Sequence, residues 1–143
     1  MNALQLLSEL DFQCKRDLYK SMPEYAIPRT RFSDKDTNSL TRAILATFKL
    51  HGIFASRIDS KGTFRQDLKR FIPTTQKRGL PDIFCQPSGL PSCWIEVKCK
   101  ATNDRLKPHQ VKIIEQLRNA GAIVFIAEDY QSFYEWFLTI NKH

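Results

Sequence analysis

The chain has 143 residues, of which 42% are hydrophobic and 11% aromatic, which is enough for one compact domain with a hydrophobic core. The composition excludes an intrinsically disordered chain, and no run of about 18 apolar residues exists that would predict a membrane span. The first twenty residues include acidic side chains and lack the basic region and cleavage site of a signal peptide. We therefore expect a cytoplasmic protein that is not secreted.

The net charge of +7 is concentrated in one part of the chain. Between positions 57 and 78 there are seven basic residues and two acidic ones. Such a stripe is the electrostatic footprint expected of a protein that binds a polyanion such as nucleic acid. A charged face that serves only solubility is the alternative interpretation. The basic residues of this stripe are Arg57, Lys61, Arg65, Lys69, Arg70, Lys77 and Arg78.

The four cysteines contain no CxxC pair, and the three histidines share no metal-ligand spacing with them. Cys85, Cys93 and Cys99 fall in strand-like runs, where a free cysteine behaves as a small apolar residue. We predict buried, reduced thiols in preference to a zinc site or a disulfide framework.

The first half of the chain predicts two helices, a strand and an arm. Apolar residues at helical spacing, the N-cap candidates Asp36 and Thr37 and the stop at Gly52 delimit the second helix. In chain order, the predictions are a helix over residues 3–20, a connector around Pro23 and Pro28, a helix over 36–51, a strand over 53–59, and a hairpin or irregular arm over 62–73.

The second half predicts strands and helices that alternate. The run at 122–129 is continuously apolar, which is typical of a strand buried on both faces. The closing helix is rich in aromatic residues and is predicted to lie in the core; burial against a second subunit, in a homodimer, is the alternative. In chain order, the predictions are strands over 82–86 and 92–100, a helix over 107–121, a strand over 122–129 and a helix over 130–141.

This order of elements predicts an α/β fold in which a mixed central sheet is flanked by helices. The helix between the last two strands favours a right-handed crossover and a parallel strand pair. We divide the chain into an N-terminal helix and connector over residues 1–30 and one α/β domain over residues 31–143.

Charged side chains occupy two predicted strands, although packing against a core disfavours them. Because a strand alternates, Glu96 and Lys98 share one face, while Ile95 and Val97 share the other. Asp82 begins the preceding strand, and a hairpin would bring it beside Glu96. Neighbouring carboxylates repel unless a cation lies between them, and Mg²⁺ takes one or two carboxylates plus water and phosphate. We infer metal-assisted hydrolysis of a phosphodiester; an ordinary surface Glu–Lys pair is the alternative.

The PD pair at 81–82, the ExK triplet at 96–98 and the following PHQ helix resemble the PD-(D/E)xK nuclease superfamily. The stretches KRGLPDIF, WIEVKCK and LKPHQVKIIEQLRNAGAIVFIAEDYQSFYEW resemble its VRR-NUC family, over residues 38–136. The resemblance implies a restriction-endonuclease-like core with the element order αβββαβ. It also implies a stand-alone, phage-like DNA endonuclease of the host cytoplasm that depends on Mg²⁺ or Mn²⁺. Such an enzyme would cut branched, Holliday-junction-like DNA or cut DNA without preference.

The resemblance also implies roles for single residues. Asp82 and Glu96 would hold the metal, together with the backbone carbonyl of Val97. Lys98 would assist the attacking water, and Gln110 would position water or a phosphate; an exposed helical glutamine without a role is the alternative. Basic residues on both sides would contact phosphates, which gives affinity and register with little sequence readout. Beyond the stripe at 57–78, these are Lys100, Arg105 and Lys107.

One position departs from the family's pattern. Members often carry an acidic residue on the first core helix as a further metal ligand, and Asn38 aligns best with it, with Asp36 slightly upstream. An amide oxygen can bind a metal but adds no charge. The alternative function is therefore a catalytically weak or silent DNA-binding or virion-associated module that retains the nuclease fold.

Overall fold

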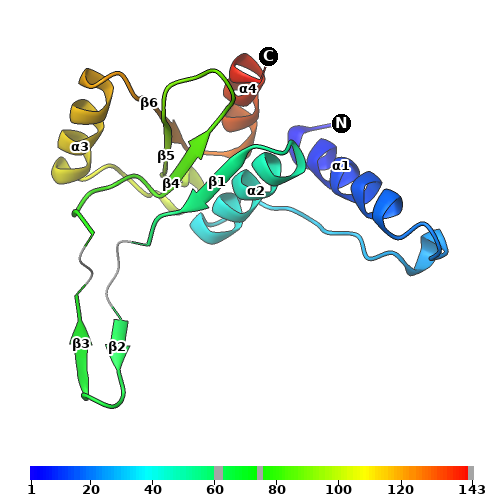
Figure 1. The fold of residues 1–143 in the computed structure, drawn as a ribbon, viewed down its shortest axis with the longest axis horizontal. Coiled ribbons are helices and arrows are strands. Elements are labelled where there is room, and N and C mark those ends of the chain that lie inside the picture. The colour runs from blue at the N-terminus through cyan, green and yellow to red at the C-terminus, as the bar shows by residue number, and fades with distance from the viewer. Residues whose placement is uncertain (60–62, 74–75, 142–143) are drawn as a thin grey trace.

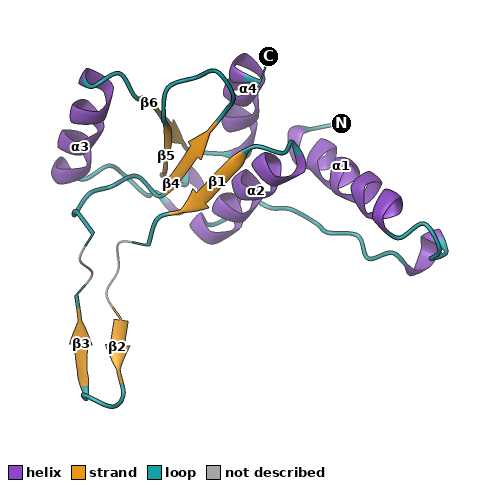
Figure 2. Ribbon diagram, viewed as in Figure 1, coloured by secondary structure: helices purple, strands orange, loops and turns teal. Residues whose placement is uncertain are grey.

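The computed structural model describes residues 1–59, 63–73 and 76–141, which form helices around a small sheet (Figure 1, Figure 2). The helices are α1 (Ala3–Leu18), α2 (Thr37–Leu50), α3 (Pro108–Asn119) and α4 (Tyr130–Ile140), with short 3₁₀ turns at Glu24–Ala26 and Lys100–Thr102. The strands are β1 (Phe54–Arg57), β2 (Thr63–Arg65), β3 (Arg70–Ile72), β4 (Ile83–Gln86), β5 (Cys93–Val97) and β6 (Ile123–Ala127). Within these ranges no helix has the length and apolar character needed to cross a membrane.

The main sheet has the strand order β1-β4-β5-β6. β1 pairs with β4 and β4 with β5 in antiparallel fashion, whereas β5 and β6 are parallel. Helix α3 connects the two parallel strands, which cannot be joined by a tight turn. It lies on one side of the sheet, and α1, α2 and α4 lie on the other (Figure 1). The predicted α/β fold, a mixed sheet flanked by helices with a parallel last pair, is confirmed.

Strands β2 and β3 belong to a second, two-stranded antiparallel sheet. This hairpin is inserted between β1 and β4 and projects away from the body of the molecule (Figure 1). The arm predicted over residues 62–73 is therefore a hairpin for the part of it that the structure describes.

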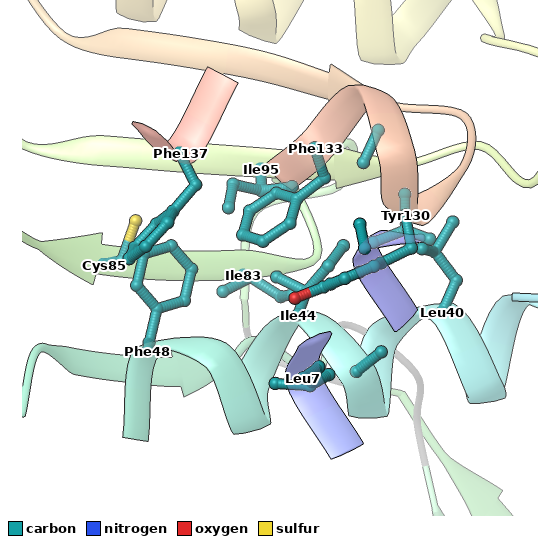
Figure 3. Close-up of a cluster of buried hydrophobic side chains, with 14 of the residues drawn as sticks. Leu7, Leu40, Ile44, Phe48, Ile83, Cys85, Ile95, Tyr130, Phe133 and Phe137 are labelled. Atoms are coloured by element: carbon teal, nitrogen blue, oxygen red, sulfur yellow. The ribbon is translucent and has the colours of Figure 1, made fainter. Parts of the chain in front are cut away.

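The main core lies between the sheet and helices α2 and α4 (Figure 3). Strand alternation turns Ile95 and Val97 of β5 toward these helices, and both are almost completely buried. Phe48 of α2 packs edge-on against Phe133 and Phe137 of α4, with ring centroids 5.7 Å apart in each pair. Such aromatic contacts stabilise the layer beyond the simple burial of apolar area.

Helix α1 joins the same core. Asn2 and Gln5 form a capping box, in which each side chain accepts a hydrogen bond from the other's backbone N–H, at 2.8 and 2.9 Å. Ala3 and Leu7 belong to the buried cluster that α2 and α4 form with the sheet (Figure 3). The first helix thus packs on the α/β body instead of standing apart from it.

The aromatic residues of α4 lie in the core or pack against it, as predicted, with Tyr134 and Trp136 only partly buried. Tyr130, Phe133 and Phe137 are fully buried, and the Tyr130 hydroxyl forms a hydrogen bond of 2.7 Å with the Thr47 hydroxyl. The aromatic content that suggested a subunit interface is therefore largely used within the chain. A homodimer remains a prediction, and the aromatic residues of α4 do not support it.

Strand β6 differs from its prediction. It lies at the edge of the sheet, and Ile123, Phe125 and Ile126 are only partly buried. Its apolar run has a different cause, because Phe125 stacks on Trp136 of α4 and the strand also packs against α3. The four cysteines agree with their prediction: all are free, and Cys14 is the one that is not fully buried.

The loop that leads into β4 packs directly against α3. Gly79 has a φ of +88°, a region that residues with a side chain rarely adopt. A Cβ atom at this position would lie 2.9 Å from the His109 carbonyl oxygen and 3.1 Å from Ile113 Cγ1. Glycine is therefore required here both by the backbone conformation and by the close approach of the helix.

We expect Gly79→Ala to lower the free energy of unfolding by about 1–3 kcal/mol or more, because strain and a backbone clash act together. Gly89→Ala is the matched control, since Gly89 also has a positive φ, +73°, but no atom lies within 4 Å of the place that its Cβ would take. Urea denaturation of both variants measures the difference. Equal losses in the free energy of unfolding for the two variants would show that the contact between Gly79 and α3 does not contribute to the effect of the substitution.

Candidate functional site

The Asp82 carboxylate lies at the end of the sheet where β4 begins. Ile83 pairs with Ile95, so in this antiparallel register the preceding residue, Asp82, is opposite Glu96. Asp82 Oδ2 also accepts a hydrogen bond of 2.8 Å from the Val97 N–H. The strand pairing thus brings two carboxylates side by side, as the hairpin predicted over these residues requires.

Glu96 is buried in β5, a central strand, with 0% of its surface exposed. Among the described residues, neither carboxylate oxygen has a hydrogen-bond donor, and the Lys98 Nζ is 3.6 Å from Oε1. Burial and then the negative charge of Asp82 raise the pKa of Glu96 from 4.5 to about 8, while the Lys98 ammonium group opposes the shift. A buried carboxylate without donors is destabilising, and a cation beside it would offset that cost.

Lys98 follows β5 and is also buried, with 8% of its surface exposed. Its backbone N–H donates a hydrogen bond of 2.8 Å to the Ala127 carbonyl, which aligns this segment with β6. Its Nζ lies between two carboxylates, 3.6 Å from Glu96 Oε1 and 3.7 Å from Asp104 Oδ1. The ammonium group is therefore held at the Glu96 end of the site between carboxyl groups from two different segments.

Sequence reasoning missed Asp104. The signal was present, because Asp104 is the one acidic residue in the basic stretch from Lys98 to Lys107. The 3₁₀ turn after β5 ends at Asn103 in the left-handed conformation, with φ at +56°, and this turn directs the next residue back to the site. The Asp104 N–H donates to the Cys99 carbonyl at 3.2 Å and fixes the loop.

A cleft of about 640 Å³ opens beside these carboxylates. It is formed where α2 begins, β1 ends and β4 begins, and the Ile58 N–H donates a hydrogen bond of 2.7 Å to the Asp82 carbonyl at this corner. Asp82 and Asp104 belong to its lining, whereas the buried Glu96 does not. The residues that line it are Thr37, Asn38, Arg57, Ile58, Asp59, Asp82 and Asp104.

Asn38 reaches the cleft from the first turn of α2. Its side-chain oxygen accepts a hydrogen bond of 3.3 Å from Arg57 Nη2, so the atom suggested as a metal ligand already has a donor. Asp36, the nearby acid, is the N-cap of α2, and its carboxylate accepts a hydrogen bond of 2.7 Å from the Ser39 N–H. The acidic residue closest to Asn38 in sequence is thus used to begin the helix.

Gln110 lies in the first turn of α3 but does not line the cleft. Its side-chain oxygen accepts a hydrogen bond of 2.9 Å from the Lys107 N–H, which satisfies a free donor at the helix start. In this structure the oxygen of Gln110 therefore has a capping role, and only its amide nitrogen is left for the predicted contact with water or phosphate.

The predicted basic residues lie on several different segments of the fold. Among those described, Arg57 is the one that lines the cleft. Lys100 forms an ion pair with Asp129, which raises the pKa of the lysine and reduces the charge it presents to a ligand. The exposed basic residues elsewhere are Arg65, Lys69 and Arg70 on the hairpin, Lys77 and Arg78 before β4, and Arg105 and Lys107 before α3, while Lys61 lies outside the described residues.

The donor set fits a hard divalent cation. Within the described ranges, no three His, Cys, Asp or Glu side chains lie close enough to form a metal site by themselves. Mg²⁺ does not require such a group, because one or two carboxylates, waters and substrate phosphate complete its coordination. Asp82 and Glu96 supply two carboxylates, and the unpaired oxygens of Glu96 are the observation that favours a cation here.

We expect Glu96→Gln to change the pH dependence of stability when divalent ions are removed. The folded protein keeps a proton on Glu96 up to about pH 8, whereas the unfolded chain releases it near 4.5. This group therefore lowers the wild-type free energy of unfolding as pH rises from about 4.5 to about 8, and an amide does not titrate.

Urea denaturation in EDTA between pH 5 and 9 measures this effect. The difference in free energy of unfolding, variant minus wild type, should grow with pH and level off above about pH 8. A difference that stays constant over this range would contradict the raised pKa of the carboxyl. Glu115→Gln, on an exposed turn of α3, is the control for the loss of one carboxylate.

Comparisons of the chain with protein-family models, with curated proteins and with solved structures found no match. What the protein does must therefore be inferred from the geometry and chemistry of its own residues.

Proposed function

We propose that the protein is a metal-dependent DNA endonuclease that hydrolyses phosphodiester bonds. The observation that carries this proposal is the Glu96 carboxylate, which is buried without a hydrogen-bond donor next to Asp82 and Lys98. Such a group is costly to fold, and a divalent cation with a phosphate is a ligand that would offset the cost. A carboxyl whose pKa is shifted by burial and a charged neighbour is also typical of functional sites.

The order of the elements supports the same proposal. Without the β2–β3 hairpin, the chain runs α2, β1, β4, β5, α3, β6, which is the order αβββαβ. We infer a restriction-endonuclease-like core from this order, with the PD pair at the start of β4 and the ExK triplet at the end of β5. The resemblance to the VRR-NUC family implies the same core.

In the proposed site, Asp82 and Glu96 hold Mg²⁺ or Mn²⁺ together with the Val97 carbonyl. A bound ion of this kind supplies positive charge to the phosphate and makes water more acidic. Lys98 donates hydrogen bonds to the attacking water and to the phosphate oxygens that gain charge as the new P–O bond forms. The P–O bond to the leaving oxygen breaks; the attacking water releases a proton to solvent, and the leaving oxygen takes up a proton from solvent. Asp104 keeps the Lys98 ammonium group in place.

The surroundings favour DNA without base-specific reading. Arg57 lines the cleft, and exposed Arg and Lys side chains lie on the hairpin and on the segments before β4 and before α3. Phosphate contacts by such side chains give affinity and register but little sequence information. We therefore propose a structure-selective or non-specific enzyme, with branched DNA among its substrates.

A second candidate function has one observation in its favour. Asn38 is neutral, and its oxygen is already bonded to Arg57, so the cleft has one ligand charge fewer than the family's pattern implies. A module that binds DNA in the same cleft but cuts it weakly or not at all would keep this fold and this charge.

We expect Asp82→Asn and Lys98→Ala each to lower cleavage by about 10²–10³-fold, the loss typical when one charge-stabilising group is removed. Plasmid, linear and four-way-junction DNA are incubated with Mg²⁺ or Mn²⁺, and EDTA should abolish cutting. Salt-sensitive DNA binding by Asp82→Asn should stay near the wild-type level. Glu115→Gln is the control, and cleavage that neither Asp82→Asn nor Lys98→Ala reduces would overturn the enzyme assignment.

We expect Asn38→Asp to lower the Mg²⁺ concentration for half-maximal cleavage by on the order of fivefold, because a unit charge near the cation is worth about 1 kcal/mol even at a water-like dielectric constant. Asn38→Ala removes the oxygen without adding charge and is the matched control. Binding in EDTA combined with no cutting by wild type or Asn38→Asp at any Mg²⁺ or Mn²⁺ concentration would instead support the silent module.

A further inference from the structure

The β2–β3 hairpin exposes aromatic and basic side chains on an arm outside the core. Phe64 and Phe71 are 54% and 59% exposed, although they are the largest apolar side chains of the hairpin. They are directly paired across the two strands, so both rings lie on the same face. Arg65 and Arg70 form the next pair and occupy the opposite face.

Folding of the free chain does not explain this pattern. A two-stranded hairpin on its own is only marginally stable in water, and like charges directly opposite each other destabilise it further. Asp67 compensates part of this charge, since its carboxylate forms two hydrogen bonds with Arg65, at 2.6 and 3.1 Å. Lys69 and Arg70 are exposed and have no ion-pair partner among the described residues. The arm therefore presents two rings and an excess of positive charge to a ligand.

The arm begins and ends at the candidate active site. β1, which precedes it, ends at Arg57, and β4, which follows it, begins directly after Asp82; both residues line the cleft. The hydrogen bond from the Ile58 N–H to the Asp82 carbonyl joins these two segments at the point where the arm departs. A nucleic acid that leaves the cleft on the side of this corner would meet the hairpin, which projects from the body there (Figure 1).

We propose that the hairpin binds unpaired nucleotides of a DNA substrate, with Phe64 and Phe71 stacking on bases and Lys69 and Arg70 contacting phosphates. This inference rests on the proposed function, because it names the DNA that the arm brings to the cleft. Bases in a duplex already stack on each other, whereas unpaired bases offer a free π-face to an aromatic side chain. The arm thus favours single-stranded segments at a fork, flap or junction over continuous duplex.

Charge decides between nucleic acid and a second copy of the chain as the occupant. The described hairpin residues carry Arg65, Lys69 and Arg70 against Asp67, and the whole chain carries +7. A second copy would bring more positive charge to a positive arm. A polyanion instead complements the arm, and its bases complement the rings.

Fluorescence anisotropy in EDTA tests the proposal without requiring cleavage. The probes are a labelled single-stranded oligonucleotide, a forked duplex with unpaired arms, and a blunt duplex. We expect Phe64→Ala and Phe71→Ala each to weaken binding of the first two by about 5- to 150-fold, the loss typical of one stacked base. Blunt-duplex affinity should change less than about twofold, and Phe64→Tyr and Phe71→Tyr should retain binding because they keep the ring.

Tyr25→Ala is the matched control, since Tyr25 is 92% exposed and belongs to the 3₁₀ turn at Glu24–Ala26, which follows α1 and is not part of the hairpin. Unchanged affinity of both alanine variants for the single strand and the fork would overturn the proposal. An equal loss on all three probes would overturn it too, as would a change from dimer to monomer in sedimentation without a selective loss of single-strand binding.

The outcome is independent of the nuclease test. If Lys98-dependent cleavage occurs while the Phe variants bind normally, the hairpin proposal fails and the enzyme assignment stands. If the Phe variants selectively lose single-strand binding while no cleavage occurs, the enzyme assignment fails and the hairpin proposal stands.

Discussion

The carboxylate of Glu96 is the constraint on which the site depends. It lies in a central strand whose two edges are both occupied by neighbouring strands, so β5 cannot move to expose it. On the same strand, Ile95 and Val97 fill the core under α2 and α4. The core therefore holds the carboxylate in place, and the cost of its burial is tolerated because the apolar face stabilises the strand. Preorganisation of this kind is what a charged site requires, because the groups need not rearrange when charge develops.

The charged residues that line the cleft are mainly acidic, whereas the exposed segments outside it are rich in basic residues. Asp59, Asp82 and Asp104 line the cleft and the buried Glu96 lies opposite Asp82, whereas the hairpin and the segments before β4 and before α3 carry exposed Arg and Lys. Basic surroundings attract a phosphate backbone at long range, but the carboxylates would repel it at contact. In the proposed site, a divalent cation between the carboxylates and a phosphate would resolve this conflict. Asp104, with its side-chain oxygen 3.7 Å from the Lys98 Nζ, explains why Lys98 can remain buried without being an isolated charge.

The sequence predicted the elements of the fold and the pairing of Asp82 with Glu96 because both follow from short-range rules. Helical spacing, caps and strand alternation are local, and a tight connection between β4 and β5 leaves few registers. It did not predict Asp104 at Lys98, because the left-handed turn at Asn103 decides where that carboxylate points. It also misjudged β6, since an apolar run does not tell an interior strand from an edge strand that is covered by Trp136. The sequence also did not predict the capping role of Gln110. A glutamine near a helix start can accept a hydrogen bond from the helix backbone or bind a ligand, and the residue type alone does not tell which.

The proposed catalytic and recognition residues lie in parts of the fold with different energetics. Glu96 and Lys98 are buried, so any substitution there alters stability as well as chemistry, and the two effects must be separated by measurement. Phe64 and Phe71 lie on a hairpin that adds nothing to the buried cluster, so they can vary without loss of the core. Selection on substrate would then act most freely on the arm, while the carboxylates stay restricted by folding. If the proposed function and hairpin role hold, a change of DNA preference would require only new side chains on the hairpin, whereas a change of chemistry would require a new core.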